Sequence, residues 1–188
     1  LGGAVWDTVT PILKAHNHRC FTPTLKDEHT CNLTGHIQQI CDLIISNNLQ
    51  NIILVGHSYG GMIITGVASK IPERIDRVVY LDADWPDPGQ SLFDVLKLSG
   101  LDPEVAIPGL EPSLAYVEKI QYDPEKAKFL KKFFIRCTEG DIAVFLDVII
   151  KKIQTSNEDW TIWNLPTIHI AQATMPEELG KLLLKASL

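Results

Sequence analysis

The sequence lacks the features that mark several large classes of protein. Only four of its 188 residues are cysteines and none forms a C-x-x-C pair, which argues against a disulfide framework and a zinc site. No apolar run approaches the ~20 residues that cross a bilayer. Its 17 Lys and Arg are outnumbered by 23 Asp and Glu, and this net charge of -6 disfavours nucleic acid, because phosphate binding needs surplus basic side chains. We therefore expect free thiols in a reducing, cytoplasmic compartment, without nucleic acid or membrane as a partner.

The chain also begins without methionine, at Leu1-Gly2-Gly3, and this start does not resemble a signal peptide. We therefore expect a further segment upstream of Leu1. The remaining composition, 45% hydrophobic and 21% charged, is ordinary for a globular protein, and the length over residues 1–188 predicts one domain with a sizeable core.

Short apolar runs alternate with longer segments of helical periodicity. The predicted strands are residues 19–22, 51–55, 77–81, 133–137 and 160–164. The predicted helices are residues 33–49, 62–70, 143–154 and 176–185. This alternation predicts an α/β fold, with a mostly parallel sheet flanked by helices.

Residues 86–128 differ in character, because short amphipathic stretches there are interrupted by Pro88, Pro103, Pro108, Pro112 and Pro124. We expect this segment to leave the sheet as a small cap-like insertion over the functional site; a plain surface connection is the alternative. Leu92, Phe93 and Leu96, together with Trp85, either line an apolar pocket beneath it or belong to the core.

Gly56-His57-Ser58-Tyr59-Gly60 has the G-x-S-x-G spacing of a nucleophile elbow. A buried β-branched run precedes it and a helical segment follows it, which is the context that the motif requires. The tight turn projects the Ser58 hydroxyl, and we expect side chains at both flanking glycines to clash with backbone. The Tyr59 N–H, at the start of a helix, is then an oxyanion donor.

A serine hydroxyl needs a base and the base needs an orienting carboxylate. In a chain with this elbow the order is serine, acid, histidine. His169 is the one histidine that follows Ser58, so we predict it as the base. His57 adjoins the serine in sequence, but we expect its ring to point away and to serve a structural role.

The acid has four candidates in two loops. The loop after residues 133–137 offers Glu139 and Asp141, and we favour Asp141 because it lies farther along that loop. The loop after residues 77–81 offers Asp82 and Asp84. Any of the four could instead cap a helix or occupy a turn.

The elbow and its surroundings resemble the group of small esterases that includes plant methylesterases and hydroxynitrile lyases, and bacterial EstC-type esterases most of all. The resemblance rests on residues 54–64 (LVGHSYGGMII), 1–6, 71–75, 79–83, 88–91, 134–138 and 173–179. It implies an α/β-hydrolase fold and hydrolysis of a small carboxylic ester without cofactor or metal. Members of this group carry a strand and an oxyanion loop just before the Leu1-Gly2-Gly3 equivalent, so the second oxyanion donor is expected upstream.

Departures from this group leave other functions open. The group usually has Gly-His-Asp around the base, where this chain has Ile168-His169-Ile170. A catalytically weak ligand-binding protein is therefore one alternative. A lyase is another, although lyases of the group carry a lysine where Ile170 stands. The expected partner is a small-molecule ester, and a homodimer is left open.

Overall fold

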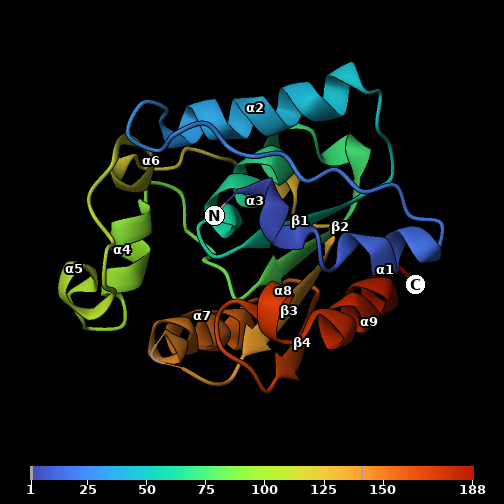
Figure 1. The fold of residues 1–188 in the computed structure, drawn as a ribbon. Coiled ribbons are helices and arrows are strands. Elements are labelled where there is room, and N and C mark those ends of the chain that lie inside the picture. Colours follow the sequence, from blue (N-terminus) through green and yellow to red (C-terminus); the bar gives the residue numbers. More distant parts are fainter. Residues whose placement is uncertain (1, 141) are drawn as a thin grey trace.

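Four parallel strands, paired in chain order, form the sheet at the centre of the molecule (Figure 1). The computed structural model describes residues 2–140 and 142–188. Its strands are β1 (Ile52–His57), β2 (Ile75–Leu81), β3 (Lys131–Cys137) and β4 (Trp160–Leu165). The four strands predicted from residue 51 onward are thereby confirmed.

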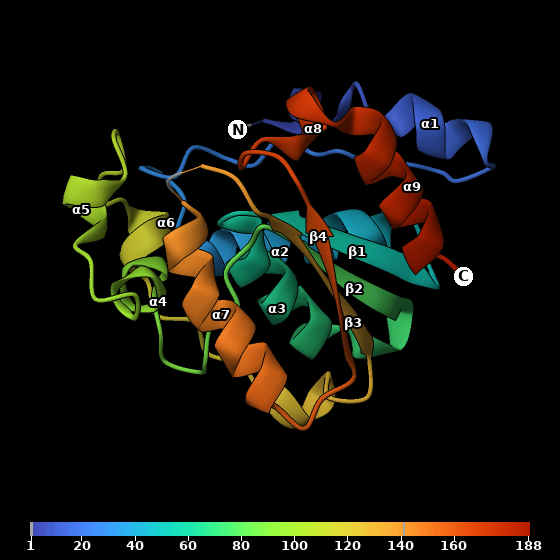
Figure 2. The ribbon, with the colours of Figure 1, turned by 90° about the horizontal axis from the view of Figure 1, so that it is seen from below.

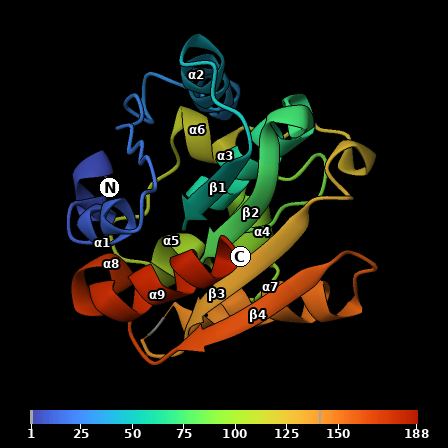
Figure 3. The same ribbon diagram turned by 90° about the vertical axis from the view of Figure 1, so that its right-hand side faces the viewer.

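Helices cover both faces of this sheet (Figures 2 and 3). One face carries α2 (Leu33–Ser46), α3 (Gly60–Lys70) and α7 (Ala143–Thr155), and the other carries α1 (Thr10–Ala15), α8 (Ala171–Thr174) and α9 (Pro176–Ala186). Short 3-10 helices are η1 (Gly3–Trp6), η2 (Pro72–Arg74) and η3 (Pro124–Lys126). The four predicted helices correspond to α2, α3, α7 and α9 and are confirmed.

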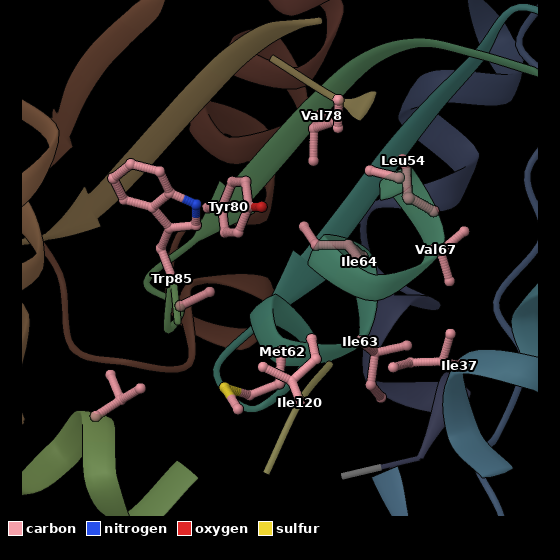
Figure 4. Packing of buried hydrophobic residues seen from close by; sticks show 14 of the residues in the cluster. Ile37, Leu54, Met62, Ile63, Ile64, Val67, Val78, Tyr80, Trp85 and Ile120 are labelled. Carbon is pink, nitrogen blue, oxygen red and sulfur yellow. The ribbon is translucent and has the colours of Figure 1, made fainter. Parts of the chain in front are cut away.

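Alternation along the strands builds the two halves of the core. On β2, Val78 and Tyr80 pack toward α3, whereas Val79 and Leu81 pack toward α9, and all four are at most 2% exposed. Figure 4 shows the first of these clusters around α3. A strand buried on both faces needs a nearly continuous apolar sequence, which is why β2 was recognisable.

The strand predicted at residues 19–22 is wrong. These residues adopt no regular structure, and β1, at one edge of the sheet, pairs only with β2 among the described residues. A β-prone sequence forms a strand only where a neighbouring strand satisfies its backbone groups. Residues 19–22 have no such neighbour within residues 2–140 and 142–188.

Between β2 and β3 the chain forms three helices of four to six residues, α4 (Leu92–Lys97), α5 (Pro103–Ala106) and α6 (Leu114–Val117). They lie together beside the N-terminal end of α2 (Figure 1). Each begins at a side-chain cap, from Ser91, Asp102 and Ser113 respectively. The prolines thus limit the regular elements here to short helices, as expected for residues 86–128.

A membrane-spanning helix is absent from the described part of the chain, where no helix combines sufficient length with sufficient hydropathy.

Candidate active site

The turn between β1 and α3 has the strained backbone that the G-x-S-x-G motif requires. Ser58 has a φ of 56°, a left-handed conformation that residues other than glycine rarely adopt. Its N–H donates to the Leu81 carbonyl at 3.2 Å, and its own carbonyl accepts from the N–H of Gly61 at 2.9 Å and of Asp84 at 3.3 Å. Two of these backbone hydrogen bonds therefore fix the turn against the end of β2, and the third lies within the turn.

The glycines around Ser58 have unequal roles. A Cβ on Gly56 would lie 2.6 Å from the Gly60 carbonyl oxygen, so that position excludes a side chain as predicted. The same prediction for Gly60 is wrong, because a Cβ there would meet open space. The crowded position is Gly61, where a Cβ would lie 2.0 Å from the Asp84 carbonyl oxygen. The helix therefore packs against the loop after β2 through Gly61.

His169, in the segment between β4 and α8, pairs with a carboxylate from the loop after β2. Its Nδ1 lies 2.7 Å from Oδ2 of Asp82, a residue that is 2% exposed. The other oxygen of Asp82, Oδ1, accepts the Cys137 N–H at 2.8 Å. Because a carboxylate accepts, the His169 Nδ1 carries the proton and Nε2 keeps a lone pair.

His57 binds the backbone of the segment that carries His169. Its Nε2 donates to the His169 carbonyl at 2.8 Å, and the two rings lie 4.5 Å apart between centroids. Burial, and next the neighbouring His169, lower the pKa of His57 to about 3, so its ring stays neutral. The structural role expected for His57 therefore consists of holding the base segment, which local sequence could not indicate.

The structure places three of the four candidate acids, each in different surroundings. Asp82 contacts His169, as described. Asp84 lies two residues farther along and makes no hydrogen bond with His169, and Glu139 is exposed on the loop after β3. Asp141, the acid favoured from the sequence, lies outside the described residues. Among the described residues, the carboxylate on the imidazole is that of Asp82.

A cavity of about 430 Å³ joins these groups. Ser58, Tyr59, Asp82, Asp84 and His169 line it, and Tyr59 is the cap residue of α3. Its volume lies in the range of ordinary small-molecule sites. Residues 86–128 contribute to its lining Leu92, Leu96, Ile107, Pro108, Gly109, Leu110, Glu111 and Tyr116.

Two residues considered for the pocket belong to the core instead. Trp85 packs edge-on against Trp160, with ring centroids 4.9 Å apart, and Phe93 is 6% exposed outside the cavity lining. Within residues 2–140 and 142–188, no group of three or more His, Cys, Asp or Glu side chains is arranged to hold a metal ion.

Comparison with known proteins places this chain in a family. The α/β-hydrolase fold family profile matches residues 3–103. The carbendazim hydrolyzing esterase of Nocardioides sp. (strain SG-4G) is 40% identical over 114 residues, which are 56% of this chain and 46% of that protein. Methylesterase 1 of Arabidopsis thaliana is 32% identical over 123 residues, 58% of this chain and 46% of that protein. The chain thus spans about half the length of these curated relatives.

Solved structures extend the likeness over the whole fold. A polyneuridine aldehyde esterase mutant superposes with a TM-score of 0.80 at 16% identity, covering 98% of this chain and 94% of that one. A pyrethroid hydrolase from Sphingobium faniae JZ-2 gives a TM-score of 0.78 at 20% identity, covering 99% and 92%. On the family match and this architecture, the chain belongs to the α/β-hydrolase fold family.

Proposed function

We propose that this chain hydrolyses small carboxylic esters through an acyl-enzyme, with Ser58 as nucleophile, His169 as base and Asp82 as the orienting acid. The observation that carries the proposal is the 2.7 Å contact between His169 Nδ1 and Asp82 Oδ2 in the same cavity as Ser58. Relatives named as esterases or hydrolases of carbendazim, pyrethroids and methyl esters add support.

The chemistry follows from the proton positions. With Nδ1–H donated to Asp82, the Nε2 lone pair of His169 accepts the Ser58 hydroxyl proton as Oγ attacks the ester carbonyl. The Tyr59 N–H, at the start of α3, stabilises the oxyanion, and the imidazolium then protonates the leaving alcohol. Water activated by the same base releases the acid. A second oxyanion donor upstream of Leu1 stays a prediction.

Asp82 replaces Asp141 as the acid in this proposal for a geometric reason. Asp82 is buried, receives the Cys137 N–H at one oxygen and faces His169 with the other, so its carboxylate has one fixed orientation. An orienting acid needs this fixed geometry in order to select the imidazole tautomer.

Labelling with a fluorophosphonate tests the nucleophile. We expect stoichiometric modification at Ser58, mapped by mass spectrometry, together with turnover of a simple aryl ester. Ser58→Ala should abolish both the labelling and the turnover. Ser99→Ala, which removes a hydroxyl from residues 86–128, should retain both. Undiminished labelling of Ser58→Ala, or none of the original protein, overturns the proposal.

One observation supports a second candidate, a ligand-binding protein with weak turnover. Within residues 2–140 and 142–188, the Ser58 hydroxyl makes no hydrogen bond to His169, although such contacts also tighten on substrate binding in working enzymes. That candidate predicts measurable affinity for ester analogues with hydrolysis at background. Rapid aryl ester turnover eliminates it. The cytoplasmic location, the single-domain organisation and the homodimer left open stay predictions.

A further inference from the structure

The cavity that contains Ser58 has a one-sided charge. Four carboxylates line it, from Glu28, Asp82, Asp84 and Glu111, and no lysine or arginine does so within the described part of the chain. The Asp82 carboxylate is hydrogen-bonded to His169, so it is not available to pair with a ligand. The other three are available to the cavity, and one of them has unusual surroundings.

The Asp84 side chain is 5% exposed and lines this cavity. Within residues 2–140 and 142–188 its carboxylate is hydrogen-bonded by its own backbone N–H and by no other residue. Its backbone is fixed, since the Asp84 N–H donates to the Ser58 carbonyl and its carbonyl lies against Gly61. A buried, unpaired carboxylate is costly, and a ligand that supplies positive charge removes that cost.

Burial raises the pKa of Asp84 to about 7; nearby His169 lowers it, Asp82 raises it, and a hydrogen bond from its own backbone N–H lowers it. Asp84 is therefore ionised in part at neutral pH, and a cation in the cavity favours its charged form.

Aromatic rings provide the second half of a cation site. Tyr59 and Tyr116 both line the cavity and meet edge-on, with ring centroids 4.9 Å apart, and Phe145 also lines it. Ring faces attract ammonium groups, and cages of aromatic rings with a carboxylate bind quaternary ammonium. Apolar side chains complete the wall, as a methylated ammonium requires.

We propose that this cavity selects esters bearing a cationic nitrogen, with Asp84 as the counter-charge beside the nucleophile. The inference rests on the proposed function and adds its substrate class. Asp84 is a specificity-determining residue in this account and takes no part in proton transfer, because Asp82 already holds the imidazole.

A matched pair of esters tests the selection. Choline butyrate and 3,3-dimethylbutyl butyrate have the same shape and differ only in replacing the charged nitrogen by carbon. At pH 8 we expect kcat/KM to be about tenfold higher for the choline ester, equivalent to one order of magnitude in transition-state affinity. Asp84→Asn brings the ratio to about one. Asp159→Asn removes an exposed carboxylate outside the cavity and retains the preference.

Binding to Ser58→Ala separates this inference from the proposed function. Calorimetry with choline and 3,3-dimethylbutan-1-ol is expected to show tighter binding of choline, and the added Asp84→Asn substitution abolishes the difference. Equal affinities, or a preference that survives Asp84→Asn, overturn the inference. If both esters are hydrolysed at similar rates, the proposed ester hydrolysis is supported and the cation selectivity is refuted. If neither ester is hydrolysed but the Asp84-dependent binding persists, the cation recognition is supported and the ester hydrolysis is refuted.

Discussion

Asp82 and Asp84 lie two residues apart in the loop after β2, yet their carboxylates have opposite surroundings. Both are at most 5% exposed. Asp82 has a partner at each oxygen, from His169 and Cys137, whereas no other described residue donates a hydrogen bond to the Asp84 carboxylate. A satisfied buried carboxylate orients its neighbours, and an unsatisfied one weakens the fold until a ligand pairs with it. Substitution of each should therefore give opposite results.

The largest effect is expected for Asp82, whose carboxylate is hydrogen-bonded at both oxygens. Asp82→Asn offers an amide N–H to Nδ1 of His169, which favours the wrong imidazole tautomer, and kcat should fall by about 10⁴. Asp141→Asn should change kcat by less than about tenfold. Steady-state kinetics on an aryl ester measures both. The reverse ranking would transfer the orienting role to Asp141.

The next effect concerns Asp84, whose substitution should be favourable: it should raise the free energy of unfolding. The pKa of Asp84 rises from 3.8 to about 7 on folding, so the stability linked to its proton is present below about pH 4 and is lost as pH rises through 7. Asp84→Asn avoids that loss and should raise the free energy of unfolding at pH 8 by up to about 4 kcal/mol, at 1.36 kcal/mol per pH unit.

Urea unfolding at pH 4 and pH 8 measures this gain. It should shrink to about 0.5 kcal/mol at pH 4, where Asp84 is protonated in the folded state and only partly ionised in the unfolded state, because that pH is close to the unfolded pKa of 3.8. Asp159→Asn, which is exposed and outside every ion pair among the described residues, serves as the control and should change stability by less than about 0.5 kcal/mol. A gain at pH 8 that equals the gain at pH 4 would show that ionisation of Asp84 has no such cost.

A third prediction concerns the contact that holds the Asp84 loop to the elbow. Gly61→Ala places a methyl group against the Asp84 backbone, which cannot move without breaking its hydrogen bond to the Ser58 carbonyl. The substitution should destabilise the fold by about 3 kcal/mol. Gly60→Ala enters open space within a helix and should be neutral or slightly stabilising. Thermal unfolding of the two variants compares them directly, and equal melting temperatures would refute the assigned contact.

The parts of this site that the sequence predicted are those set by local pattern. The G-x-S-x-G turn, the strands on either side of it and the position of His169 after β4 each depend on a few neighbouring residues. The buried runs of β2 and β3 were equally clear, since both faces of these strands are covered. Residues 19–22 show the limit, because a β-prone run without a neighbouring strand stays irregular.

The parts that escaped prediction depend on contacts between distant residues. Asp82 meets His169 across 87 positions, and His57 meets the His169 carbonyl across 112. Motif order gave four carboxylates, but only the parallel register that sets Leu81 beside Ile135 determines which one reaches the imidazole. The difference between Gly60 and Gly61 likewise depends on the loop that crosses above them.

The smallest predicted effect distinguishes the role of the Tyr59 ring from that of its hydroxyl. His36 is 1% exposed; its Nε2 donates to the Lys26 carbonyl, so its Nδ1 accepts the Tyr59 hydroxyl at 3.0 Å. Tyr59→Phe leaves that nitrogen unpaired and should cost about 1 kcal/mol in urea unfolding. The preference for the choline ester should persist, because the ring face remains. Tyr116→Phe, whose hydroxyl has no hydrogen-bond partner among the described residues, should leave stability unchanged; a loss of preference in Tyr59→Phe would instead assign cation recognition to the hydroxyl.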